Sequence, residues 1–195
     1  MTALRREDLL NLEQYSEQRE MLLEEVIEIK KERLIQVGEN VSLLFENKKT
    51  IQYQIQEMLR IEETFEAKDI EEELNVCNPL IPDGTNLKAT MLIEFPEEEI
   101  RKKRLEEMHL VEDKVWIQIG ENERVFAISD KNIERSNEEN IPVTHFLRFE
   151  FSNLMIKDFR AGMTMFVGID HPKYNVRTKE IQKKVTKSLS EDLIL

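Results

Sequence analysis

The feature that most constrains the fold is a change of pattern in the middle of the chain, between Asn78 and Phe95. This stretch, NPLIPDGTNLKATMLIEF, begins with two prolines and a glycine and ends in strand-like alternation. Helical patterns lie before it, and strand patterns lie mostly after it. The prolines fix the backbone angle and remove two hydrogen-bond donors, and Pro82-Asp83-Gly84 is typical of a turn. The sequence therefore predicts an α+β protein with a stiff loop at its centre.

Residues 5–37 have the apolar spacing of a long helix, with a break near Tyr15 and Ser16 and with Gly38 placed as a left-handed C-terminal cap. The apolar stripe of this helix packs either on the body of the protein or along the seam of a homodimer. A short strand at 41–46 follows, and then an ambiguous segment. Residues 50–56 alternate as a strand does, but the composition favours a helix over 48–66. A short helix is expected over 69–76.

The second half repeats one order of elements, which is strand, helix, strand, strand. The first unit has strands at 87–95, 114–120 and 124–129 and a helix at 96–108, and the second has strands at 144–151, 163–170 and 175–181 and a helix at 152–162. A polar link at 130–142 separates the units, and a helix near 182–193 ends the chain. We therefore expect one antiparallel sheet from two βαββ-like units, related by an approximate two-fold axis. The helical N-terminal region, residues 1–77, is expected to pack on one face of the sheet region, residues 78–195, within one compact domain.

Composition excludes several classes of partner. The formal net charge is -12, whereas nucleic-acid binding and anionic membrane surfaces both need clustered Lys and Arg. No apolar run approaches the roughly 20 residues that span a bilayer, and the first residues carry acids where a signal peptide is apolar. We therefore expect a cytoplasmic protein. Cys77 is alone, so it forms no intrachain disulfide and is more typical of a buried structural cysteine than of a reactive thiol.

No motif in the sequence indicates a reaction. Glu106 and His109 form one Glu-x-x-His, but a di-iron bundle needs that motif on two helices and further carboxylates. The three histidines and Cys77 are scattered, without zinc-ligand spacing. Glycine-rich phosphate loops and nucleophile motifs are absent. The sequence therefore predicts no metal and no cofactor, and it names no catalytic residue.

Candidate binding residues come from the central loop and from the polar faces of two strands. Alternation along 90–95 and 145–151 puts an apolar face on one side and a mixed face on the other. The mixed face is expected to carry Glu94, Gln118, Arg148 and Glu150. Asp83, Asn86 and Lys88 lie in the loop that runs into the first of these strands. Such residues either bond their own turn or face a ligand, and a solvated face with cross-strand ion pairs is the simpler interpretation.

Six segments together resemble a bacterial family of uncharacterised proteins, known as a domain of unknown function. They are LLFEN, QIQEMLRIEETFE, NPLIPDGTNLKATMLIEFP, VWIQIG, HFLRFEF and GIDHP. The resemblance implies a stand-alone cytoplasmic protein. It also implies genes often placed beside a rubrerythrin and an iron–sulfur oxidoreductase related to heterodisulfide reductase subunits, hence a redox or peroxide-stress context. It assigns no catalytic residue.

Two functions remain open. The first is a non-catalytic accessory protein that binds a partner protein, for which the resemblance suggests a redox enzyme. The second is an enzyme or small-molecule binder with a pocket between the Asp83–Lys88 loop and the mixed sheet face.

Overall fold

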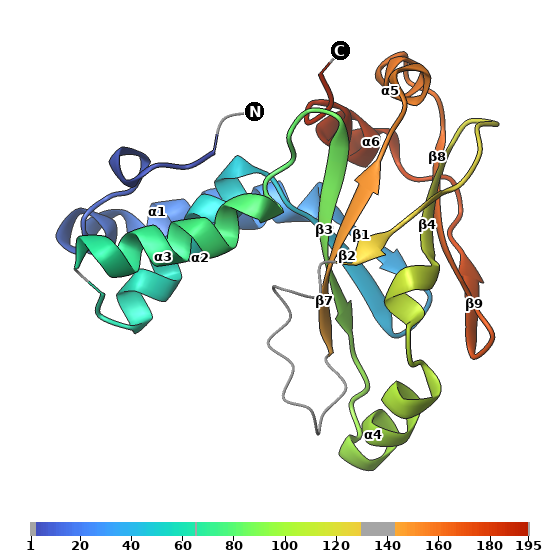
Figure 1. Ribbon diagram of the computed structural model, residues 1–195, viewed down its shortest axis with the longest axis horizontal. Coiled ribbons are helices and arrows are strands. Elements are labelled where there is room, and N and C mark those ends of the chain that lie inside the picture. The colour runs from blue at the N-terminus through green and yellow to red at the C-terminus, as the bar shows by residue number, and fades with distance from the viewer. Residues whose placement is uncertain (1–2, 65, 130–142, 195) are drawn as a thin grey trace.

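A computed structural model describes residues 3–64, 66–129 and 143–194. Its helices and antiparallel sheets confirm the predicted α+β class (Figure 1). The predicted polar link at 130–142 lies outside the described residues, as does Phe65 in the predicted helix 48–66.

The N-terminal region forms a layer of helices. These are η1 (Arg6–Asp8), α1 (Leu12–Lys31), α2 (Lys48–Ile61) and α3 (Ala67–Cys77). Asn11 caps α1, because its side chain accepts from the backbone N–H of Gln14, and Asn47 caps α2 in the same way through Thr50. Residues 50–56 are therefore helical. The predicted break near Tyr15 and Ser16 is wrong, since both residues lie inside α1.

The predicted helix over 5–37 is wrong at its end, where Leu34–Val37 forms strand β1. Ile35 and Val37 are buried and their neighbours are exposed, so this segment follows a period of two instead of a helical period. β1 pairs with β2 (Val41–Phe45), and Ile35 lies opposite Leu43. Gly38 has φ of +76° and belongs to the hairpin turn between these strands, not to a helix cap.

The strands form two sheets, not the single sheet that we expected. The five-stranded sheet has the order β1-β2-β3-β7-β6, where β3 is Asn86–Ile93, β7 is Thr144–Glu150 and β6 is Ile128–Ser129. The four-stranded sheet has the order β5-β4-β8-β9, and its strands are Val125–Phe126, Val115–Ile119, Met165–His171 and Tyr174–Arg177. The predicted strand at 124–129 is thus divided, since β5 and β6 join different sheets.

The helices of the repeated units explain why there are two sheets. α4 (Glu98–Glu107) follows β3, α5 (Asn153–Arg160) follows β7, and each connection carries the chain from the five-stranded to the four-stranded sheet. Equivalent strands are antiparallel neighbours, β3 with β7 and β4 with β8, while β5 and β9 lie at the two outer edges. This pairing is the one that a two-fold axis between the units would generate. The remaining elements are η2 (Asn78–Leu80), η3 (Val111–Lys114) and α6 (Lys183–Ser190).

The main core lies between the inner faces of the two sheets. Leu43 and Phe149 from one sheet and Ile117 and Val167 from the other are fully buried in a single cluster. Burying such side chains contributes about 1.5–3 kcal/mol each. A second, smaller cluster joins α2, α3 and η2, and Phe146 on the outer face of β7 packs against it. The helices therefore lie on the outer side of the five-stranded sheet (Figure 1).

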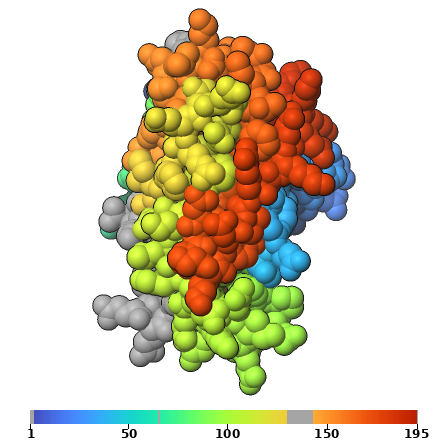
Figure 2. Space-filling view, turned by 90° about the vertical axis from the view of Figure 1, so that its right-hand side faces the viewer, coloured from blue at the N-terminus to red at the C-terminus, as the bar shows by residue number. Residues whose placement is uncertain are grey.

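The outer side of the four-stranded sheet is at the surface between α5 and α4 (Figure 2). Trp116 is on this side but is 1% exposed, because the Arg124 guanidinium lies 4.0 Å from its ring centre. Its indole N–H donates to Asp170 at 2.8 Å. Gly168 gives the ring its space, since a Cβ there would lie 2.2 Å from the indole.

Candidate functional site

The turn before β3 is closed by its own side chains. Asp83 accepts hydrogen bonds from the backbone N–H of Thr85 at 2.9 Å, from the Thr85 hydroxyl at 2.8 Å and from the Asn86 amide at 2.8 Å. Asn86 in turn accepts from the Asp83 backbone N–H at 3.2 Å. Burial by itself raises the pKa of Asp83, but the bonds from Thr85 and Asn86 outweigh it and hold that pKa below its ordinary value. The turn therefore has one well-determined shape.

Five of the six predicted binding residues gather beside this turn. In the register of β3 with β7, Asn86 lies opposite Glu150 and Lys88 lies opposite Arg148, all on the outer face. The Asn86 amide donates to Glu150 at 3.0 Å, and Arg148 donates to the same Glu150 oxygen. With Asp83 these residues form what we call the turn cluster. Most of its polar side chains bond one another.

Glu94 does not belong to the turn cluster. It follows β3 at the opposite end and is exposed. Its backbone N–H donates to the Asn40 carbonyl at 2.8 Å, and its backbone carbonyl accepts from the Asn40 side-chain amide at 3.0 Å. Gln118, which we also expected on the mixed face, lies on β4 in the other sheet. Alternation gives the face of a strand correctly, but it carries no information on which sheet a strand joins.

The residues weighed as metal ligands stay apart. Within the described ranges, no three His, Cys, Asp or Glu side chains converge in a way that would hold a metal ion. Cys77 is buried and its thiol lies 3.3 Å from a carboxylate oxygen of Glu73. The carbonyl of His109 lies 3.2 Å from Nε2 of His171, so these residues meet through one ring and one backbone atom.

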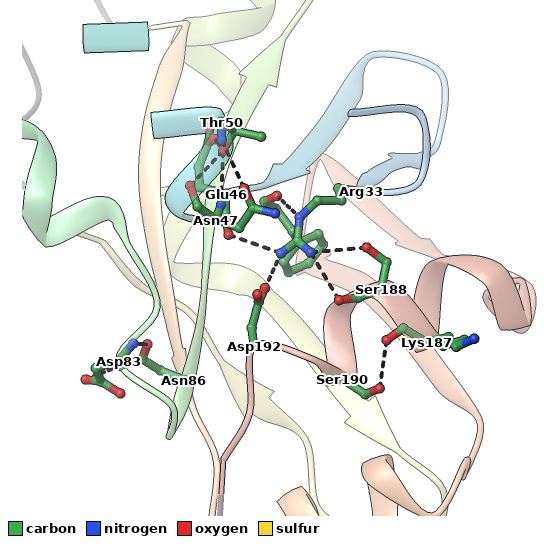
Figure 3. Close-up of polar contacts among 11 residues, drawn as sticks. Arg33, Glu46, Asn47, Thr50, Asp83, Asn86, Lys187, Ser188, Ser190 and Asp192 are labelled. Carbon is green, nitrogen blue, oxygen red and sulfur yellow. Dashed lines mark hydrogen bonds and ion pairs between the residues drawn. The ribbon is translucent and has the colours of Figure 1, made fainter. Parts of the chain in front are cut away.

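Sequence reasoning missed a buried arginine (Figure 3). Arg33 is 1% exposed. Its guanidinium donates to the Phe45 carbonyl at 2.7 Å, to the Glu46 carbonyl at 3.1 Å and to the Ser188 carbonyl at 3.1 Å. It also donates to the buried Asp192 carboxylate. The predicted helix over 5–37 put Arg33 among the charged residues of its polar face, and its partner Asp192 lies far away in the sequence.

Glu46 links Arg33 to the turn cluster. Its carboxylate is buried and accepts from the hydroxyls of Thr50 and Thr90. Its backbone carbonyl accepts from Arg33, and its N–H donates to the Lys88 carbonyl at 2.8 Å. One network of hydrogen bonds thus joins the C-terminal segment, the start of α2 and the outer face of β3.

A cavity of about 300 Å³ opens beside the arginine. Its lining residues are Glu28, Ile29, Glu32, Arg33, Asn47, Ser188, Glu191 and Asp192. Two of the rim acids are paired with lysines, Glu28 with Lys31 and Glu32 with Lys184. Burial raises the pKa of Asp192 to about 6, although Arg33 acts in the opposite direction.

The C-terminal segment runs from this arginine to the turn. The Ile194 N–H donates to the Gly84 carbonyl at 2.8 Å, and the Phe151 N–H donates to the Thr85 carbonyl at 3.0 Å. Ile194 is 52% exposed, and Leu154 at the start of α5 is 61% exposed. The loop before β3, α5 and the C-terminus lie at one end of the molecule, and α4 lies at the other (Figure 1). We call the turn 83–86 with Ile194 and Leu154 the turn-end surface.

Of the helices in the described ranges of the chain, none combines the length and apolarity that crossing a membrane requires.

These features define a class of α+β protein, two face-to-face sheets with a helical layer on one side. Within that class, the chain matches the model of the family described as "Protein of unknown function (DUF3501)" over residues 3–193. It therefore belongs to this family, which confirms the resemblance to a domain of unknown function. The genomic neighbours stay a prediction.

Among solved structures, the chain is similar to a novel protein of unknown function from Burkholderia pseudomallei. The sequence identity is 40%, the TM-score is 0.94, and the match covers 99% of this chain and 100% of that one. No curated protein matches.

The hydrogen bonds of the turn lead to a stability prediction. Asp83→Ala removes the acceptor of three of these bonds, so we expect a loss of about 1 kcal/mol or more in the free energy of unfolding. Lys88→Ala, from the same face, is the matched variant and should stay within about 0.5 kcal/mol of wild type. Urea unfolding measures both. An Asp83→Ala protein as stable as wild type would contradict the structural role of Asp83.

The pKa of Asp192 leads to a prediction on pH dependence. Because its folded-state pKa is raised to about 6 from an ordinary 3.8, the folded chain holds this proton to a higher pH than the unfolded chain. The stability from this group is present below about pH 4 and is lost as the pH rises through 6. Asp192→Asn cannot ionise. We expect its stability relative to wild type to improve by on the order of 1–3 kcal/mol between pH 4 and pH 7. Urea unfolding at both pH values checks this, and a constant difference would count against it.

Proposed function

We propose that the protein is an accessory protein that binds a partner protein through the turn-end surface. The observation that carries the proposal is a turn locked by Asp83 and Asn86, with the exposed Ile194 beside Gly84 and with α5, which carries the exposed Leu154, at the same end of the molecule. Loops held by a rigid scaffold are frequent binding sites, and a preorganised contact lowers the entropy cost of association.

The side chains of the turn-end surface indicate which groups a partner would present to it. Ile194 and Leu154 are exposed apolar side chains at this end of the molecule, and interfaces bury apolar groups inside a polar rim. Arg148, Lys88 and Asp83 supply charged groups in the turn cluster. Since the chain has a formal net charge of -12, long-range attraction favours a partner that is positively charged around its contact.

The class of partner comes from the family resemblance, which suggests a redox enzyme. The alternative expectation was a small-molecule pocket between the Asp83–Lys88 loop and the mixed sheet face. We do not favour that version, because the side chains of Asp83, Asn86, Arg148 and Glu150 bond one another.

Capture from cells of the source organism tests this proposal. Wild-type protein with an affinity tag should retain a partner at near-stoichiometric amount, and Leu154→Asp should lose it, because a charge in place of this exposed apolar side chain is costly to bury in an interface. Ile100→Asp is the matched control, since Ile100 is 46% exposed on α4 at the opposite end.

Melting curves confirm that both variants are folded. The proposal fails if wild type captures no partner at that level, or if Leu154→Asp captures it as well as wild type does.

A further inference from the structure

A second cavity lies between helices α1 and α2, away from the turn-end surface. Its volume is about 220 Å³. It is lined by Asp8, Leu10, Tyr15, Gln18, Leu22, Glu25, Val26, Ile29, Lys49, Gln52, Tyr53 and Gln56. The lining residues of α1 recur at helical spacing, as do those of α2, so the cavity follows the seam where the two helices face each other.

The two walls differ in chemistry. The α1 wall has an apolar stretch of Leu22, Val26 and Ile29, whereas the α2 wall carries the amides of Gln52 and Gln56 and the phenol of Tyr53. Small-molecule sites typically combine apolar walls with a few placed polar groups.

Hydrogen bonds around the cavity fix the spacing of the two helices. Gln56 accepts from the Leu10 N–H at 2.6 Å and donates to the Leu10 carbonyl at 3.2 Å, and Gln52 donates to the Asp8 carbonyl at 2.6 Å. Tyr15 donates to Glu57 at 2.8 Å, and Arg19 binds the same carboxylate through two nitrogens. The segment before α1 is therefore fixed across α2, and the space is built into the fold.

The charges of the lining favour a neutral occupant. Glu25 is paired with Lys49 at 3.3 Å, and Asp8 is paired with Lys48 at 3.4 Å. An ionised ligand would lose hydration without gaining a free countercharge. The volume lies below the roughly 300–1,000 Å³ of sites for drug-sized ligands, which limits the occupant to a small molecule of about the size of a bicyclic aromatic ring.

We infer that this cavity is a binding site for a neutral, mainly apolar small molecule with one polar edge. The apolar body lies on the α1 wall. The polar edge bonds the Tyr53 phenol, which can both donate and accept, and the amide oxygen of Gln52. The site is independent of the partner-binding surface proposed above.

Fluorescence titration with the neutral bicyclic dye 1-naphthylamine tests the inference on the full chain. We expect a saturable rise that corresponds to one site. At pH 7, neutral 2-naphthol should displace the dye at least about tenfold more effectively than the 2-naphthoate anion, which corresponds to about 1.4 kcal/mol. Absence of saturable binding, or equal displacement by the two competitors, would overturn the inference.

Variants with a larger side chain in the lining test whether the dye binds in this cavity. Leu22→Trp puts a larger side chain into the lining and should weaken dye binding at least about tenfold. Met21→Trp, the neighbouring residue, is 59% exposed, does not line the cavity and should bind as wild type does. If Leu22→Trp fails to fold, the half-buried lining residue Gln18 is replaced by Trp instead. Wild-type affinity in a folded filling variant would contradict the site.

Discussion

The buried guanidinium of Arg33 is the interaction on which the arrangement of the molecule depends. An isolated buried charge is costly, and it is tolerated when its hydrogen-bonding groups and its charge are all matched. Arg33 meets this condition through the carbonyls of Phe45, Glu46 and Ser188 and through the carboxylate of Asp192. The planar fork of arginine reaches these acceptors from one position, which a lysine ammonium cannot do. One side chain thus joins the end of α1, the end of β2 and the C-terminal segment.

The turn-end surface and the cavity between α1 and α2 both depend on the residues that Arg33 joins. Asp192 and Ser188 hold the segment that ends at Ile194, and Ile194 in turn bonds Gly84 in the turn. The backbone carbonyl of Glu46 accepts a hydrogen bond from Arg33, and its carboxylate accepts one from the Thr50 hydroxyl at the start of α2. The position of α2 relative to α1, and with it the cavity between them, therefore depends on the same network.

Local pattern predicted much of the fold, and long-range pairing decided the rest. Alternation along 90–95 and 145–151 gave the correct faces, so Arg148 and Glu150 could be expected on one side of a sheet, whereas Asn86 was expected only in the loop. Residues 50–56 alternate as a strand does, but the Asn47 cap and the helical packing of Ile51 and Ile55 overrode that pattern. Leu34–Val37 continued the helical spacing, and it is a strand because Ile35 and Val37 are buried in pairing with β2. Local sequence cannot report such a pairing.

The site was less predictable for the same reason. Arg33 and Asp192 are 159 residues apart in the sequence, and neither stands in a motif. Glu94 lies just beyond the end of β3 that is far from the turn cluster. The cavity between α1 and α2 depends on how far apart two helices are held, which no periodicity expresses.

Amide hydrogen exchange in the Arg33→Lys variant tests the central role of this arginine most directly. The substitution keeps the charge and removes the planar fork. Asp192, Leu193 and Ile194 each donate a backbone hydrogen bond in the segment that Arg33 holds. The account predicts faster exchange at these amides than in wild type, while the amides of β4 and β8 in the four-stranded sheet keep their protection. Unchanged exchange at residues 192–194 would contradict it.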